Sequence, residues 1–172
     1  MKNSGFLKRH GIVRNAIRED LLYFALPWIL VMSAGLVLSA RDLVRQHGSL
    51  YVLSVQSVVG LALLGSGLTI MLFSQITLWR NYSATLVIKE DHQLITSGIY
   101  RFTRHPIYLG VIVGLMGIAV YASSLYGFLA MSAVIPVFLN RIRMEERLLT
   151  EAFGDTYREY RKATNKLIPF IY

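Results

Sequence analysis

The sequence has no cysteine at any of its 172 positions. This absence excludes disulfide bonds, a catalytic thiolate and cysteine-based metal sites. Charge is also scarce: Asp, Glu, Lys and Arg make up 16% of the chain, whereas 54% of the residues are hydrophobic. This balance is too apolar for an ordinary soluble domain and is typical of an integral membrane protein of one domain.

Acidic residues are the scarcer charge, with 10 Asp and Glu against 18 Lys and Arg, so the formal net charge is +8. In a soluble protein this excess would favour nucleic-acid binding. Here the basic residues cluster beside apolar runs, and no nucleic-acid recognition motif accompanies them. Membrane topology and anionic headgroups explain the charge more simply. We therefore expect membrane lipids as partners and no nucleic acid.

Charged residues are missing altogether from three long stretches, residues 21–40, 50–79 and 107–139. A helix crosses the hydrocarbon core with about 20 residues, so the last stretch is barely long enough for two crossings. A turn at Ala122, Ser123 and Ser124 would divide it. The sequence therefore predicts an all-α integral membrane protein with about four transmembrane helices. The last two would form a tight hairpin over residues 106–140, with a kink at Pro136 in its second arm.

Two groups of small residues predict close helix packing. They lie in the second and third apolar stretches, and their glycines are Gly60, Gly65, Gly67, Gly110, Gly114 and Gly117. The polar segments are less regular. Residues 1–20 predict either a basic interfacial helix or a basic tail that only sets topology. Residues 41–49 are expected to form a loop, and residues 80–104 either a small hairpin or a compact loop.

The tail from Asn140 is helical in pattern, with Gly154 as a C-cap and Asp155 at the start of a further helix. With four crossings, both termini and residues 80–104 share one side of the membrane. That side holds nearly all of the Lys and Arg, and only Arg41 and Arg45 lie opposite. The positive-inside rule predicts that the shared side is cytoplasmic. The polar loop and the tail can then build one site.

Two clusters on that side are candidates for chemistry. Arg104 and His105 precede Pro106 at a predicted helix start, where free N–H groups and the positive dipole end suit a carboxylate. Arg141 stands where the last apolar helix leaves the membrane, four residues before Glu145. The alternatives are headgroup contacts for the first cluster and an ordinary ion pair for the second. No histidine spacing predicts a metal site.

Several motifs in fixed order resemble one family. They are H-Q-L-I-T-S-G-I-Y at 92–100, R-H-P-I-Y-L-G at 104–110, R-x-x-x-E-E at 141–146, F-G at 153–154, Y-x-x-Y at 157–160 and I-P-F at 168–170. Over residues 80–172 they resemble the isoprenylcysteine carboxyl methyltransferase family, with phospholipid N-methyltransferases as more distant relatives. The resemblance implies a membrane-embedded enzyme that converts S-adenosylmethionine to S-adenosylhomocysteine without a Rossmann-type domain. It makes residues 80–172 the catalytic region and residues 21–79 two transmembrane helices.

The resemblance also implies roles for individual residues. Arg141 would meet the substrate's carboxylate, with Glu146 beside it, and Arg141 and Arg104 are the expected catalytic residues. The expected cofactor-binding residues come from the loop, the start of the helix after it and the C-terminal side: His92, Gln93, Leu94, Ile95, Tyr100, His105, Pro106, Ile107, Tyr108 and Glu145. The cofactor would enter from the cytoplasm, and a lipophilic or lipidated acceptor would enter from the bilayer.

The chemistry of the acceptor stays open between two classes. A carboxylate nucleophile needs an orienting cation but no base, and isoprenylcysteine-like O-methylation is the first expectation. An amine acceptor, as in phospholipid N-methylation, would need Glu145 or Glu146 as a base. Two further alternatives are an NADPH-dependent membrane reductase and a non-enzymatic membrane protein. The mark of a transporter, an ionisable residue in mid-span, is absent from all four predicted spans.

Overall fold

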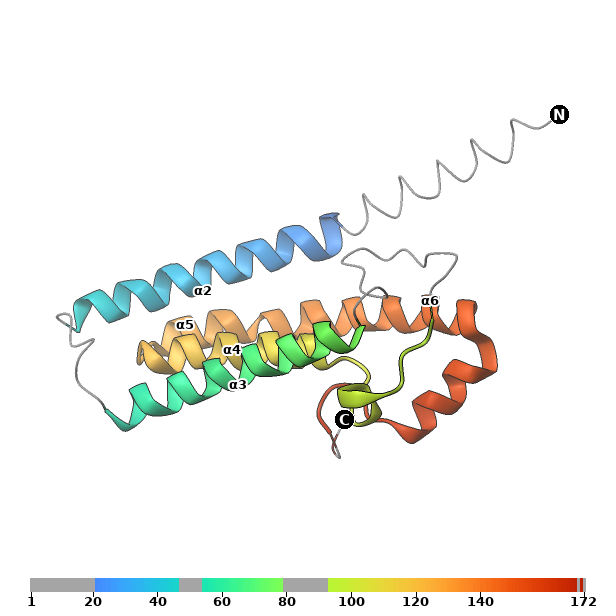
Figure 1. Cartoon of the computed structure of the whole chain (residues 1–172). Coiled ribbons are helices and arrows are strands. Elements are labelled where there is room, and N and C mark those ends of the chain that lie inside the picture. Colours follow the sequence, from blue (N-terminus) through green and yellow to red (C-terminus); the bar gives the residue numbers. More distant parts are fainter. Residues whose placement is uncertain (1–20, 47–53, 79–92, 170, 172) are drawn as a thin grey trace.

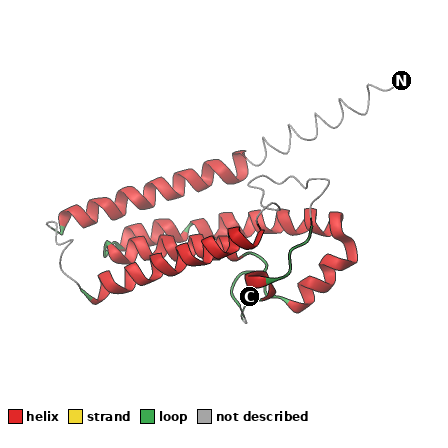
Figure 2. Ribbon diagram, in the orientation of Figure 1, coloured by secondary structure: helices red, strands yellow, loops and turns green. Residues whose placement is uncertain are grey.

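The computed structural model describes residues 21–46, 54–78, 93–169 and 171. Within these residues the secondary structure is helical, with no strand, as Figure 2 shows. A π-helical turn, η1 (Leu21–Ala25), leads into α2 (Leu26–Arg45), which is followed by α3 (Val55–Leu78) and a 3-10 turn, η4 (Gly98–Arg101). The chain continues as α4 (Pro106–Tyr121), α5 (Leu125–Ser132) and α6 (Val134–Ala163). The predicted all-α class is confirmed in the described residues.

The helices form an elongated bundle with α4 and α5 at its centre (Figure 1). Helix α3 packs along α4, whereas α2 packs mainly on α5 and also touches α6. The outward faces of α2 and α3 carry exposed apolar side chains such as Leu30, Val37, Leu61 and Leu68. The second half of α6 leaves the bundle and turns back beneath it, close to η4 (Figure 1). The second half of α6 and η4 therefore lie together at one end of an apolar bundle.

Three described helices are long and apolar enough to cross a membrane: Leu22–Arg45, Val55–Leu78 and Leu125–Ala163. The third predicted crossing in chain order corresponds to α4, which is apolar but has only 16 residues. Two expected boundaries are wrong. Helix α2 continues through Arg45, where a loop was expected from residue 41. Helix α6 runs from Val134 past residue 140 to Ala163, so the last apolar helix and the charged tail are one element.

The predicted turn at Ala122, Ser123 and Ser124 is confirmed, because α4 ends at Tyr121 and α5 begins at Leu125. Ser124 caps α5 by accepting a hydrogen bond from the Gly127 amide at 3.0 Å. Its hydroxyl also donates to Asp42 at 2.6 Å, and Gln46 donates to the Ala122 carbonyl at 3.0 Å. The polar end of α2 therefore holds this turn, which explains why α2 extends past Ala40.

Two breaks shape the second arm of the predicted hairpin. The first separates α5 from α6 at Ala133, three residues before Pro136. Proline lacks an amide hydrogen and its ring clashes with the carbonyl four residues earlier, which accounts for a break just before it. The second lies at Gly154, whose φ of 54° and ψ of −125° interrupt the helix as the sequence predicted. This break redirects the chain toward η4.

Helices α3 and α4 approach closely through their glycines, as predicted. A Cβ placed on Gly67 would lie 2.5 Å from both the Gly110 carbonyl oxygen and the Gly114 amide nitrogen. A Cβ on Gly117 would lie 2.5 Å from the Leu64 amide nitrogen. Gly65, which was expected to belong to the same packing face, has nothing within 4 Å of such an atom. The contact therefore depends on Gly67 and Gly117 but does not involve Gly65.

Replacing Gly67 by alanine is expected to destabilise the protein by about 1–3 kcal/mol, because the new methyl group would meet backbone atoms that cannot rotate away. Gly65→Ala is the matched control on the same helix. It should leave stability unchanged or raise it slightly, since alanine favours helix over glycine. Thermal unfolding in detergent compares the two variants. Equal effects would contradict this account of the helix contact.

Candidate active site

The segment before α4 is held in place by the C-terminal end of the chain. Thr103 forms a parallel bridge with Asn165, and the Arg104 amide donates to the Asn165 carbonyl at 2.9 Å. The Thr103 hydroxyl donates to the Leu167 carbonyl at 2.9 Å, and the Tyr160 hydroxyl donates to the Tyr100 carbonyl at 2.6 Å. These contacts fix where α4 begins. The second tyrosine of the Y-x-x-Y motif, Tyr160, thus holds the segment before α4, a role that the sequence did not predict.

Arg104 forms a buried ion pair with Glu146. The Nε–Oε1 distance is 2.8 Å, and the two side chains are only 8% and 7% exposed. The Arg104 guanidinium also donates to the carbonyls of Arg161 and Thr164. The Arg161 guanidinium lies 4.0 Å from the second oxygen of Glu146. Arg104 therefore joins the start of α4 to the middle and the end of α6.

His105 lies between the two carboxylates of α6. Its Nδ1 is 3.8 Å from Glu145 Oε2 and its Nε2 is 3.6 Å from Glu146 Oε1. The imidazole is 3% exposed, and Nε2 has no hydrogen-bond partner among the described residues. Tyr108, three residues on, donates from its hydroxyl to Glu145 Oε2 at 3.1 Å. The first turn of α4 and the middle of α6 thus share one polar cluster, as the topology argument predicted.

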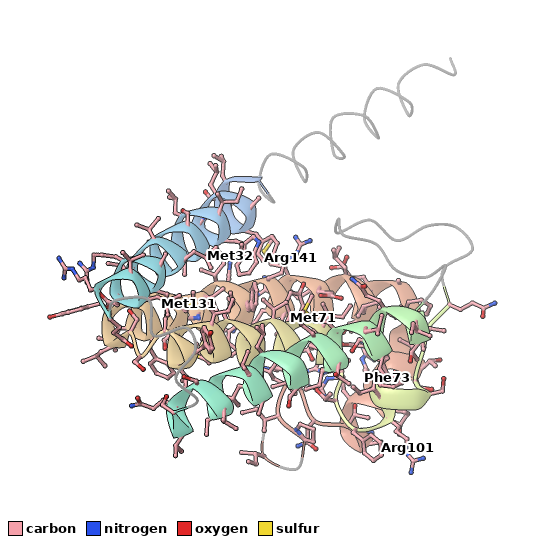
Figure 3. The ribbon with its side chains drawn as sticks, turned by 60° about the vertical axis from the view of Figure 1, so that its left-hand side comes forward. Met32, Met71, Phe73, Arg101, Met131 and Arg141 are labelled. Carbon is pink, nitrogen blue, oxygen red and sulfur yellow. The ribbon has the colours of Figure 1, made fainter. Side chains whose placement is uncertain are left out.

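Arg141 lies one turn before Glu145 on α6 and is only 3% exposed. Its guanidinium carbon stands 4.7 Å above the centre of the Phe24 ring. Figure 3 shows Arg141 on the side of α6 that faces α2. Glu145 directs its carboxylate toward Tyr108 and His105 on α4. Glu145 also acts on Arg141 electrostatically, so the i, i+4 pair considered from the sequence is one of several interactions of these two residues.

An aromatic group connects Arg141 with the polar cluster. The Phe138 ring is 5.0 Å from the Tyr108 ring and 5.0 Å from the Trp28 ring, centre to centre. Phe24 lies 6.0 Å from Phe138. Sequence reasoning missed Phe24 and Trp28, which were treated only as part of an apolar span. Their spacing of four residues on one helix face was the available signal.

The other expected site residues lie at the start of α4 and in the segment before it. Pro106 is buried at the start of α4, with Ile107 half-buried beside it. Tyr100 is buried in η4. Gln93 is exposed, and Leu94 and Ile95 are half-buried in irregular backbone. His92 and residues 86–88, which were considered for a small hairpin, lie outside the described residues.

Tyr157 is a further polar residue that sequence reasoning left without a role. It is 1% exposed, and its hydroxyl has no hydrogen-bond partner in the described part of the chain. Its ring lies 6.0 Å from that of Tyr160 in an edge contact. Two tyrosines from the segment beyond Gly154, Tyr157 and Tyr160, therefore lie beside the polar cluster.

The described helices form an apolar bundle with a buried ionic cluster at one end. This arrangement is typical of a helical membrane protein that has a polar site. The family model for phospholipid methyltransferases matches residues 53–156. The chain belongs to this family. The match begins before residue 80, so it includes α3 as well as the sequence motifs from residue 92 to Gly154, whereas the motifs at 157–160 and 168–170 lie beyond it. Together with its three long apolar helices, this membership makes the chain an integral membrane protein.

Individual relatives agree with this membership. A protein-S-isoprenylcysteine O-methyltransferase of Schizosaccharomyces pombe is 39% identical over 83 residues, covering 48% of this chain and 35% of that protein. A probable protein-S-isoprenylcysteine O-methyltransferase of Oryza sativa subsp. indica is 33% identical over 118 residues, covering 67% and 62%. Methanethiol S-methyltransferase 1 of Bradyrhizobium diazoefficiens is 41% identical over 73 residues, covering 42% and 25%. The chain thus spans less than two thirds of each of these relatives.

A solved structure shows the same fold. It is that of the eukaryotic intramembrane Ras methyltransferase ICMT, an isoprenylcysteine carboxyl methyltransferase, with a TM-score of 0.72 and 23% sequence identity. The likeness covers 90% of this chain and 56% of the other. The predicted resemblance to the isoprenylcysteine carboxyl methyltransferase family is therefore confirmed.

Proposed function

We propose that this protein is a membrane-embedded, S-adenosylmethionine-dependent methyltransferase that esterifies a carboxylate on a lipophilic acceptor, as in isoprenylcysteine carboxyl O-methylation. The observation that carries the proposal is the position of Arg141. It is a buried cation at the boundary between the apolar part of α6 and the polar cluster. A buried ionisable group at such a boundary is a functional candidate by default.

The residues around the start of α4 fit the polar groups of the cofactor. Its carboxylate suits the amide groups of the first helical turn, which have no partner within the helix. Its ammonium suits Glu145, whose side chain is 35% exposed. The buried Nε2 of His105, which has no hydrogen-bond partner among the described residues, suits a further polar contact. The other cofactor-binding residues expected from the sequence would line the same pocket from the loop side.

The reaction requires alignment more than proton transfer. When bound, S-adenosylmethionine supplies an electrophilic methyl group, which an acceptor oxygen takes as the C–S bond breaks and S-adenosylhomocysteine is released. Arg141 holds the acceptor carboxylate through its planar guanidinium, which matches two carboxylate oxygens. The aromatic group around Phe138 excludes water from this contact. Glu146 and Arg104 position the start of α4 against α6 and so set the distance between the two halves of the site.

We further propose that the polar cluster faces the cytoplasm, together with both termini. This arrangement requires α4 to serve as a fourth crossing. Its 16 residues give a length of about 24 Å, so it would cross only where the bilayer thins or where neighbouring helices shield its ends. The cofactor then arrives from the cytoplasm, and the acceptor enters laterally from the bilayer.

A second candidate is methylation of an amine on a phospholipid headgroup, which the description of the matched family favours. In that reaction Glu145 would accept the proton, since its carboxylate lies within hydrogen-bond distance of Tyr108 and is the more exposed of the two. The buried cation at Arg141 favours the carboxylate acceptor. Membership of a methyltransferase family gives no support to the reductase and non-enzymatic alternatives.

Thermal stabilisation of the purified protein tests the proposal. S-adenosylhomocysteine at about 100 times its Kd is expected to add about 2.7 kcal/mol, which raises Tm by roughly 5–10 °C for a chain of this length. NADPH and a no-ligand sample are the controls. Stabilisation by NADPH alone would overturn the proposal. Lipid extracts incubated with methyl-labelled cofactor then separate the acceptors, since an ester releases its label in base and a methylated amine does not.

A further inference from the structure

Phe24 stands in an unusual stretch of backbone at the start of the first membrane helix. It belongs to the π-helical turn η1, directly before α2. Pro27 follows within the first turn of α2 and has no amide hydrogen to donate to the preceding turn. π-Helical turns are rare and occur often at functional sites, because they rotate one side chain out of the regular helical register. Phe24 also lies outside residues 53–156, which match the family model.

The ring of Phe24 lies directly beside the proposed substrate-binding cation. The Arg141 guanidinium carbon lies 4.7 Å above its centre, well within the range of a cation–π contact. Phe138, which is 2% exposed, packs against the Phe24 ring and limits its movement. Because Arg141 is itself 3% exposed, the contact is shielded from water. Burial makes such a contact stronger than it would be at a surface.

Stacking on the Phe24 ring uses only the face of the Arg141 guanidinium. A guanidinium stacked on a ring uses its face, whereas it binds a carboxylate through N–H groups in its own plane. The ring therefore restricts the rotation of Arg141 without competing for the same hydrogen bonds. The aromatic face also stabilises the charged form of the guanidinium.

We propose that Phe24 is the positioning residue that orients Arg141 toward the anionic head of the acceptor, so that the first membrane helix sets acceptor affinity. This inference rests on the proposed function for the role of Arg141 in acceptor binding. It places part of the acceptor site in a segment outside the family match. The cofactor contacts that we propose at the start of α4 do not depend on the Phe24–Arg141 contact.

The Phe24–Arg141 contact can be tested without measuring methyltransferase activity. Phenylglyoxal modifies accessible guanidinium groups, and mass spectrometry measures the labelling of Arg141 relative to Arg143, an exposed internal reference two residues away. Phe24→Leu, which keeps an apolar side chain but removes the ring, should raise this ratio about 5- to 30-fold, as expected for loss of a shielded cation–π contact. Phe24→Tyr should restore it. Tyr23→Leu is the matched control, since Tyr23 is 64% exposed in the same turn.

The kinetic arm uses N-acetyl-S-farnesylcysteine as acceptor. Phe24→Leu should raise the acceptor KM by about 5- to 30-fold, while the KM for S-adenosylmethionine stays within about twofold and Phe24→Tyr recovers the loss. A purely structural role would instead lower Tm and change both KM values together. Unchanged labelling of Arg141 in Phe24→Leu, or equal effects of Phe24→Leu and Tyr23→Leu, would overturn the inference.

The two proposals fail in different ways. If the wild-type protein neither turns over the farnesylcysteine probe nor gains stability from S-adenosylhomocysteine, the proposed function is wrong, and the labelling ratio still decides the Phe24–Arg141 contact. If turnover occurs and labelling changes but the acceptor KM does not, Phe24 holds Arg141 without setting acceptor affinity, and the inference is overturned while the proposed function stands.

Discussion

Replacing Arg141 by alanine is expected to lower kcat/KM for methyl transfer by about 100- to 1,000-fold, equivalent to about 3–4 kcal/mol for loss of a buried charged contact to the acceptor. The physical reason is that a carboxylate taken out of water needs a fixed cation, and Arg141 is the buried cation beside the aromatic group. Thermal stabilisation by S-adenosylhomocysteine should persist, because the cofactor contacts that we propose at the start of α4 and at Glu145 do not involve Arg141.

Three comparison variants make this result specific. Arg143→Ala removes an exposed cation from the same helix and should leave turnover unchanged. Arg141→Lys keeps the charge but loses the planar fork, so it should recover only part of the activity. His105→Ala should show the reverse pattern, with cofactor stabilisation lost first. If Arg141→Ala abolished stabilisation by S-adenosylhomocysteine as fully as it abolished turnover, the assignment of Arg141 to the acceptor would be wrong.

Breaking the Arg104–Glu146 pair should have the largest effect on stability. The two side chains are 8% and 7% exposed, so Glu146→Gln leaves a buried guanidinium without its counterion. Removing one partner of a buried pair costs about 3–5 kcal/mol. Chemical denaturation in detergent measures the loss. Arg158→Ala is the matched control, since it breaks an exposed pair with Asp155, in which the side chains are 63% and 89% exposed, and should cost at most about 1 kcal/mol.

The double variant Arg104→Met with Glu146→Met separates a positioning role from a chemical one. Removing both charges together should recover much of the stability, because no buried charge is left uncompensated. Recovery of activity along with stability would indicate that the pair only positions α4 against α6. A stable but inactive double variant would support the catalytic role that the sequence suggested for Arg104. No recovery of stability would contradict the ion-pair account itself.

Local signals in the sequence predicted several elements correctly. The turn at Ser123 and Ser124 was visible because polar residues interrupt a long apolar run. The interruption at Gly154 was visible because glycine tolerates a positive φ at a helix end. The close approach of α4 was visible in its glycine spacing, although the sequence did not identify Gly67 and Leu64 of α3 as its neighbours. Each of these features depends on a few consecutive residues or on one helical period.

The sequence predicted which segments form the candidate site, but it did not predict which side chains pair within it. The sequence predicted that residues 92–110 and 141–146 lie on one side of the membrane, and the structure places His105 within 4 Å of both Glu145 and Glu146. The sequence could not predict that Arg104 pairs with Glu146, since any carboxylate on that side could neutralise Arg104. The extension of α6 past residue 140 was also missed, because a change from apolar to charged composition does not itself end a helix.

The sequence by itself determined the class of this protein. Its apolar runs require helices that satisfy their own backbone groups in lipid, and its ordered motifs identify a membrane methyltransferase family. Only the tertiary structure decided what surrounds the central arginine. Phe24 and Arg141 are separated by more than a hundred positions, and no periodicity relates them. Their contact depends on α2 packing against α5 and α6 and on a widened turn before Pro27, which aims one ring at one guanidinium.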